Sequence, residues 1–301
     1  MLILTGNENS EKQNSILLKD GRRLGYKEYG VKDGFPIMGL HGTPGSRIWF
    51  SGNDPTSVEL GIRLITIDRP GYGLSDEKKD RKIIDFNEDI NELIHQLRIT
   101  RFSIFGVSGG GAYALAFASG GHAQLLKVGM VASAFEFEGG NPPVEMCRPN
   151  RIGFYLAKRF PWLLRFNYRQ QKKLLYEKPE VYLESSQKQV SHLCKSDQEV
   201  MQNEATQKSM MLHMREAFRS SAVEAVSELK LLGNLWGIDF SDINAPIEVW
   251  HGEADTLSPI NGLKKFITRI PKCNTHFLKE KGHFLDEDDD LWRKILLSLK
   301  D

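Results

Sequence analysis

A serine set between glycines is the residue of this chain best suited to act as a nucleophile. Residues 106–110 read GVSGG, which places Ser108 in a G-x-S-x-G pattern. The pattern follows an apolar run at 102–107 and precedes small residues at 112–118, so we expect a sharp turn from a buried strand into a helix. Such a turn exposes the hydroxyl, and the glycines leave room for it. The backbone N–H of Gly109 would then stand at a helix N-terminus, where it can bind an oxyanion formed at Ser108.

The same glycines also fit two other interpretations. One is an ordinary strand-to-helix turn, and the other is a loop that binds phosphate. A Walker loop would end in Gly-Lys followed by Ser or Thr, and a dinucleotide-binding turn would read G-x-G-x-x-G. Neither pattern is present here, which argues against phosphate binding. The ordinary turn stays open on this motif alone.

Three other segments carry the groups that a serine nucleophile needs. Residues 41–46 read HGTPGS and follow an earlier apolar run, where a second donor to the oxyanion is expected. Asp255 follows a late apolar run, and His283 stands in a KGHF segment after the last one. A serine hydroxyl is a weak nucleophile unless a base takes its proton. His283 could be that base and later protonate the leaving group, while Asp255 could hold the imidazole in the required tautomer.

Together these segments resemble the α/β-hydrolase superfamily over nearly the whole chain. The order Ser108, Asp255, His283 is the order of nucleophile, acid and base in that superfamily. Residues 68–75, which read DRPGYGLS, resemble its D-R-x-G-x-G-x-S loop. The resemblance implies a Ser-His-Asp triad that works through an acyl-enzyme intermediate.

The resemblance also implies how the oxyanion hole is built. The N–H of Thr43 is expected to join that of Gly109 in binding the oxyanion. His41 and Gly42 are expected to support this loop, His41 by hydrogen bonding and not by titrating. No metal ion and no organic cofactor is expected, because the triad supplies its own nucleophile and base.

Other residues could take the place of the acid or the base. Glu253 is a close neighbour of Asp255. Glu136 or Glu138 could act from the end of the strand expected at 128–132, where some superfamily members place the acid. His251 precedes the acid loop but lacks the Gly-His context of His283. We favour Asp255 and His283.

The resemblance leaves several substrates open. Haloalkane dehalogenases and epoxide hydrolases have a loop like 41–46, but they use an aspartate nucleophile where this chain has Ser108. Proline iminopeptidases carry H-G-G-P-G where this chain reads HGTPG. We favour hydrolysis of small to medium, apolar carboxylic esters. The alternatives are a proline-iminopeptidase-like aminopeptidase, a C–C bond hydrolase, and a ligand receptor or regulator that turns over once or not at all.

The elements that must position these residues predict an α/β fold with a mostly parallel central sheet flanked by helices. A hairpin is expected over 15–29, turning at Asp20-Gly21, and a crossover helix over 83–97. Strands are expected at 36–40, 62–67, 102–107, 128–132, 247–250 and 275–278. The α/β-hydrolase core would span 1–134 and 243–301, and a helical lid would be inserted at 135–242.

The expected lid has two unusual stretches. Residues 148–173 hold eight basic residues, no acidic residue and six aromatic residues. A helix with a solvated basic side is the favoured interpretation, and contact with a membrane or an anion is the alternative. Methionines cluster at 201, 210, 211 and 214. Helix packing is the default interpretation of this cluster, and the lining of an apolar pocket is the alternative.

The composition excludes several classes of protein. The chain has 301 residues, with 40 Lys and Arg against 39 Asp and Glu, so it lacks the basic excess of a nucleic-acid binder. It has no apolar run long enough to cross a membrane, and residues 1–13 do not resemble a signal peptide. Three scattered cysteines favour a reduced, cytoplasmic protein.

The acidic run 286–290 is read as a helix start and not as a metal site. The expected partner is a small ester-like substrate; the oligomeric state stays open.

Overall fold

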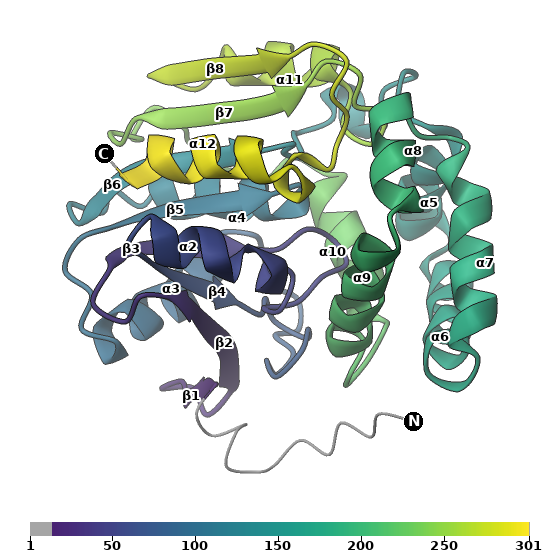
Figure 1. Ribbon diagram of the computed structural model, residues 1–301, viewed down its shortest axis with the longest axis horizontal. Helices are drawn as coiled ribbons and strands as arrows, with labels where there is room; N and C mark the ends of the chain where they lie inside the picture. The colour runs from purple at the N-terminus through teal and green to yellow at the C-terminus, as the bar shows by residue number, and fades with distance from the viewer. Residues whose placement is uncertain (1–13, 301) are drawn as a thin grey trace.

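One eight-stranded sheet runs through the computed structural model, which describes residues 14–300. The expectation about residues 1–13 therefore lies outside the described residues. Strand order in the sheet is β1-β2-β4-β3-β5-β6-β7-β8. The first two strands are antiparallel to their neighbours, and all later pairs are parallel. Figure 1 shows the sheet with helices on both of its faces.

The strand predictions are confirmed, with small differences at the ends. The bounds are β1 (Ser15–Leu17), β2 (Arg23–Gly30), β3 (Phe35–Leu40), β4 (Ile62–Ile67), β5 (Phe102–Val107), β6 (Leu125–Val131), β7 (Ile247–Gly252) and β8 (Cys273–Leu278). The hairpin between β1 and β2 also turns where it was expected, since the N–H of Gly21 bonds to the carbonyl of Leu18. Every residue of β5 and of β7 is buried. This burial on both faces explains the nearly continuous apolar run of β5, whereas β7 also buries Glu248 and His251.

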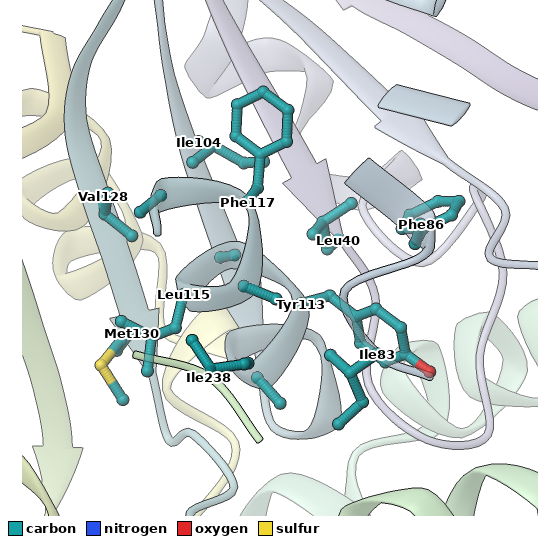
Figure 2. Packing of buried hydrophobic residues seen from close by; sticks show 14 of the residues in the cluster. Leu40, Ile83, Phe86, Ile104, Tyr113, Leu115, Phe117, Val128, Met130 and Ile238 are labelled. Carbon is teal, nitrogen blue, oxygen red and sulfur yellow. The ribbon is translucent and has the colours of Figure 1, made fainter. Parts of the chain in front are cut away.

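Two hydrophobic clusters lie on the two faces of the sheet. The larger contains α3 (Phe86–Gln96), α4 (Gly109–Ala118) and α11 (Ile260–Ile267), and the other contains α12 (Asp289–Lys300). Figure 2 shows the centre of the larger cluster, with Tyr113, Leu115 and Phe117 of α4 among strand residues. All ten residues of α4 are buried. The helix that follows Ser108 is therefore fixed on the sheet.

Two helices do not begin where the sequence suggested. The crossover helix begins at Phe86 and not at residue 83, because the Asp85 carboxylate accepts the N–H of Lys82 at 2.7 Å and closes a turn ahead of the helix. Helix α4 begins at Gly109 and not at Ala112. Its glycines are helical despite their low propensity, since tertiary packing overrides that preference.

The interval between β6 and β7 holds a helical insertion made of helices α5 to α10. Their bounds are α5 (Arg148–Arg159), α6 (Pro161–Glu177), α7 (Pro179–Val190), α8 (Lys195–Gln202), α9 (Glu204–Ala217) and α10 (Glu224–Leu232). They stand at the right of Figure 1, beyond the points of the β7 and β8 arrows. Pro161 breaks the basic stretch into two helices, since proline cannot continue a helix but fits its first turn. None of the helices among the described residues is long and apolar enough to cross a membrane.

The ends of the interval 135–242 belong to the core by packing. Phe135 and Phe137 precede the first helix, and Trp236 and Phe240 follow the last one, yet all four are buried in the larger cluster. The part of the interval that stands apart from the sheet is thus shorter than the expected lid. These flanking residues anchor both ends of the helical insertion in the core.

Candidate active site

Ser108 forms the turn between β5 and α4. Its φ is 53° and its ψ is −122°, a conformation that is costly for any residue other than glycine. The turn is held by three backbone bonds: Ser108 donates to Val131 at 2.9 Å, and its carbonyl accepts from Gly111 at 3.1 Å and from Ala134 at 2.9 Å. A Cβ at Gly106 would collide with the backbone of Gly110. The glycines of the motif are therefore required for the turn that presents the serine.

The loop after β3 lies against this turn. A Cβ at Gly109 would collide with the Thr43 hydroxyl, and one at Gly42 would lie 3.5 Å from the Cβ of Ser108. Within residues 14–300, no hydrogen bond takes up the N–H of Gly109 or that of Thr43. Both N–H groups are thus unbonded within this part of the chain and available to a further acceptor.

A buried ion pair ties this loop to the helical insertion. Arg69 and Glu228 are both fully buried, and Arg69 donates to the two carboxylate oxygens of Glu228 at 2.7 Å each. Arg69 also donates to the carbonyls of His41 and Gly42, and Glu228 accepts the Thr43 hydroxyl at 2.8 Å. Arg69 lies in the 68–75 motif, but Glu228 on α10 has no motif around it. Sequence reasoning missed this pair.

His41 supports the loop as a neutral imidazole. Its Nδ1 lies 2.8 Å from the carbonyl of Gly42, and its Nε2 accepts the backbone N–H of Arg69 at 3.3 Å. Nδ1 therefore carries the proton. Burial and then the charge of Arg69 hold the pKa of His41 well below its ordinary value.

Asp255 and His283 are joined by a hydrogen bond. The Oδ2 of Asp255 lies 2.7 Å from the Nδ1 of His283. The other oxygen, Oδ1, accepts the N–H groups of Leu257 at 2.7 Å and Ser258 at 2.8 Å, so the carboxylate is fixed in place. An imidazole whose Nδ1–H is bonded to a carboxylate has its Nε2 lone pair free to act as a base.

The fold lowers the pKa of Asp255 and raises the pKa of His283. Burial would raise the pKa of Asp255, but the charge and hydrogen bond of His283 lower it below its ordinary value. Burial would lower the pKa of His283, but Asp255 and, beyond it, Asp197 and Asp286 raise it overall. The folded protein therefore favours an ionised Asp255 and makes His283 a stronger base.

Ser108 and His283 lie on the same edge of the sheet, since Ser108 follows β5 and His283 follows β8. No hydrogen bond joins them in the described part of the chain. In ligand-free structures the bond between nucleophile and base is often long, and it shortens when substrate binds.

The alternative acids are engaged elsewhere. Glu136 accepts the N–H of Trp236 at 2.7 Å, Glu138 pairs with Lys265, and Glu253 lies 3.8 Å from Lys264. His251 lies 3.5 Å from Asp255 Oδ2, but its Nε2 is bonded to the carbonyl of Ser258 at 2.7 Å. Of the candidate acids, Asp255 is the one that contacts His283.

The acidic run 286–290 was only partly interpreted correctly. Asp289 and Asp290 do stand in the first turn of α12. Asp286 does not: it is 3% exposed, precedes the helix and accepts the indole N–H of Trp49 at 2.5 Å. Among residues 14–300, no cluster of His, Cys, Asp and Glu could hold a metal ion.

A cavity of about 180 Å³ opens beside the site, between the helical insertion and the loop that carries Trp49. Pro44 follows Thr43, Phe284 follows His283, and both line it. Ser108 and His283 are not among its lining residues. Gly42 separates the Trp49 ring from the serine, since a Cβ there would lie 2.8 Å from that ring and 3.5 Å from the Cβ of Ser108. The methionines that line the cavity are Met201, Met210, Met211 and Met214. The pocket alternative for the methionine cluster is therefore supported.

Known proteins match this chain in sequence and in fold. The model of the family described as serine aminopeptidase, S33, matches residues 57–290. A proline iminopeptidase of Xanthomonas citri is 29% identical over 137 residues, which make up 42% of this chain and 42% of that protein. A non-heme chloroperoxidase of Streptomyces lividans is 30% identical over 32% of this chain and 36% of that protein. The chain thus spans less than half the length of these curated relatives.

Solved structures match over nearly the whole chain. An esterase from Exiguobacterium antarcticum superposes with a TM-score of 0.67 at 20% identity, covering 95% of this chain and 98% of that chain. The esterase RhEst1 from Rhodococcus gives a TM-score of 0.67 at 18% identity, covering 94% and 96%. At these identities the likeness concerns the fold alone. The chain belongs to the serine aminopeptidase S33 family and has the α/β-hydrolase fold.

Proposed function

We propose that this α/β hydrolase is a serine carboxylesterase that acts on small to medium, apolar esters. The observation that carries the proposal is the Asp255–His283 hydrogen bond at the edge where the strained Ser108 turn presents its hydroxyl. The two free N–H groups of Gly109 and Thr43 add the donors that an acyl transfer needs.

The reaction follows from these groups. Ser108 Oγ attacks the ester carbonyl while His283 Nε2 takes its proton, and the oxyanion accepts the N–H groups of Gly109 and Thr43. As the tetrahedral intermediate collapses, the C–O bond to the alcohol breaks and His283 protonates the departing oxygen. Water then attacks the acyl-enzyme with His283 again as base. Asp255 keeps Nδ1 protonated and stabilises the imidazolium throughout.

The cavity supports an apolar substrate. Most of its wall is apolar, formed by methionines of α8 and α9 together with Trp49, Phe284 and Tyr182. Polar residues also line it: Ser186, Gln187, Gln207 and His213. Apolar walls favour a hydrocarbon portion of the substrate over a charged one. Methionine side chains adapt to different shapes, which suits a tolerant pocket.

Glu228 disfavours the aminopeptidase alternative. A free substrate amine needs an unpaired carboxylate near the serine. Two carboxylates of the helical insertion contact the loop after β3: Glu228 accepts the Thr43 hydroxyl, and Glu216 is paired with Arg47. Both oxygens of Glu228 are occupied by Arg69, whose charge would repel an ammonium group. We therefore place esters ahead of peptides with a free N-terminus.

Turnover of matched substrates tests the proposal. Purified protein is assayed with p-nitrophenyl esters of graded acyl length and with prolyl and alanyl p-nitroanilides, beside Ser108→Ala. We expect steady ester turnover that the alanine variant lacks, with little cleavage of the anilides. A single burst without further turnover would favour the receptor alternative, and faster cleavage of the prolyl anilide would favour the aminopeptidase.

A further inference from the structure

The loop that carries His283 is held by a carboxylate of the helical insertion. Asp197 stands in the first turn of α8 and is 1% exposed. Its two carboxylate oxygens accept the backbone N–H of His283 at 2.8 and 2.9 Å, and Oδ1 also accepts the N–H of Phe284 at 3.2 Å. Hydrogen bonds from N–H groups to an ionised acceptor are about twice as strong as neutral ones.

The residue before His283 is adapted to this contact. Gly282 lies against Asp197, and a Cβ at this position would collide with the Asp197 carboxylate. A buried carboxylate is costly unless hydrogen bonds compensate for lost water, and here the compensating donors are those of the His283 loop. The loop and α8 therefore stabilise each other.

Asp197 is also one of the charges around the imidazole. Asp255 bonds to the ring from the loop after β7, and His251 approaches Asp255 from the end of β7. Asp286, in the turn before α12, and Asp197, on α8, supply more distant negative charge. Of these groups, Asp197 alone comes from the helical insertion.

We propose that Asp197 is a positioning residue, which fixes the His283 loop so that the triad is complete only while α8 is docked on the core. The inference rests on the proposed hydrolase function. It makes the helical insertion part of the machinery that orients the base, and not only a cover over the cavity.

Two substitutions separate the positioning bonds from the charge. Asp197→Asn keeps a carbonyl oxygen for the N–H groups but loses the charge, and Asp197→Ala loses both. For Asp197→Ala we expect kcat for a p-nitrophenyl ester to fall roughly 10- to 100-fold, with KM little changed, since a small misplacement of a catalytic group has such an effect. Asp197→Asn should retain more of the rate. Glu199→Ala is the matched control, because Glu199 is exposed on the same helix.

An activity-independent readout distinguishes this inference from the proposed function. Titration of the His283 ring by NMR should show a lower pKa in both Asp197 variants than in the wild type, and an unchanged pKa in Glu199→Ala. A wild type with no esterase activity would overturn the proposed function, while the titration would still report the contact. An unchanged His283 pKa in Asp197→Asn, or wild-type kcat in a folded Asp197→Ala, would overturn the inference.

A second observation concerns the outer side of α5 and α6. Four of the six aromatic residues in the basic stretch are exposed: Tyr155 at 55%, Phe160 at 43%, Trp162 at 67% and Phe166 at 57%. Ile152 and Leu163 are exposed beside them, at 46% and 41%. The other two aromatics face inward, since Phe154 packs on Phe137 and Tyr168 packs on Phe218. The six exposed residues are called the outer apolar face: Ile152, Tyr155, Phe160, Trp162, Leu163 and Phe166.

Helix spacing and a ring contact bring residues of the outer apolar face close to one another. Trp162 and Phe166 are one turn apart on α6, Ile152 and Tyr155 are nearly so on α5, and the Tyr155 and Phe160 rings are 6.2 Å apart. The two helices carry eight basic residues and no acidic residue over 148–173, although Lys172 turns to the carbonyls of Arg219 and Ser220. A second copy of the chain would bring like charges together, so self-association through this face is disfavoured.

We infer that the outer apolar face docks on an anionic lipid bilayer. Aromatic and aliphatic side chains enter the region between headgroups and acyl chains, while surrounding lysines and arginines attract acidic headgroups. The sequence alone favoured a solvated basic side for these helices. The outward orientation of the aromatic rings changes that preference.

Sedimentation with vesicles tests this surface. The wild type should pellet with phosphatidylcholine vesicles that contain phosphatidylglycerol, and less so at high salt or without the acidic lipid. The double variant Trp162→Ala/Phe166→Ala should bind at least about tenfold more weakly. Leu17→Ala is the control, since Leu17 is 71% exposed and belongs to β1, the edge strand at the opposite side of the sheet from β8. Absence of wild-type binding to the acidic vesicles, or equal binding by the double variant, would overturn the inference.

Discussion

The sheet edge and the helical insertion contribute to the site in different ways. At the sheet edge, each candidate residue follows a strand and stands in a short motif, as Ser108 does after β5 and His283 after β8. In the insertion, Asp197 and Glu228 reach the same site from α8 and α10 with no motif around them. Strand ends fix a residue's position locally, whereas the insertion acts through contacts that exist only once the chain has folded.

The largest expected effect tests the sheet edge alone. Asp255→Asn removes the carboxylate that bonds His283 Nδ1, so the imidazole can adopt the wrong tautomer, and we expect kcat to fall roughly 10⁴-fold. Circular dichroism checks the fold. Glu138→Gln is the control, because Glu138 is exposed and pairs with Lys265. If Asp255→Asn kept the wild-type kcat while Glu138→Gln lost most of it, the catalytic acid would instead be Glu138, which follows β6.

A stability measurement tests the link between the two regions. Arg69→Met removes the bidentate partner of buried Glu228 and leaves it with the Thr43 hydroxyl and with Arg81 at 3.7 Å. Breaking a buried ion pair typically costs about 3–5 kcal/mol of unfolding free energy, and the remaining partners place the expected loss at the lower end of that range. The double variant Arg69→Met/Glu228→Leu should recover much of this loss. Urea denaturation measures both variants. An Arg69→Met protein as stable as the wild type would show that the insertion does not depend on this pair.

The pH dependence tests how the surroundings tune the base. The pKa of His283 is raised, so kcat/KM should fall on acidification with a midpoint above the ordinary histidine value of about 6.5. The contribution of protonated His283 to folding stability has the opposite pH dependence. This contribution is fully present below the pKa of histidine in the unfolded chain, and it is lost as the pH rises through the higher pKa of His283 in the folded protein. A midpoint below 6.5 would contradict the raised pKa.

The smallest expected effect concerns the cavity. Met210→Ala shortens a side chain in its wall, so the ratio of kcat/KM for longer over shorter acyl esters should rise by several-fold, up to about tenfold. Leu212→Ala is the matched control, since Leu212 is on the same helix and 49% exposed. An unchanged ratio in Met210→Ala would exclude this cavity as the acyl pocket.

Much of the sheet could be predicted because its signals are local. The runs at 62–67 and 102–107 coincide with β4 and β5, since strands buried on both faces are continuously apolar. Helix ends were less predictable: Asp85 shortens α3 by closing a turn that the 3.6-residue period cannot reveal.

The residues of the site were also predictable only where the signal is local. The motifs indicated Asp255 and His283, which the structure joins by a hydrogen bond; the catalytic roles of the triad and of the oxyanion donors stay predictions. The acidic pattern predicts a helix start at Asp286, because acidic residues are common there. The structure instead buries this residue against Trp49, more than 200 positions away in the chain. Such contacts depend on the packing of distant segments and leave no local pattern.

Labelling with a fluorophosphonate tests the central claim most directly. The probe reacts with a serine only when a base activates the hydroxyl and an oxyanion site receives the phosphoryl oxygen. Intact-mass spectrometry of the wild type should show one stoichiometric adduct, and Ser108→Ala should show none. An unlabelled wild type, or an equal adduct on Ser108→Ala, would contradict the assignment of Ser108 as the nucleophile.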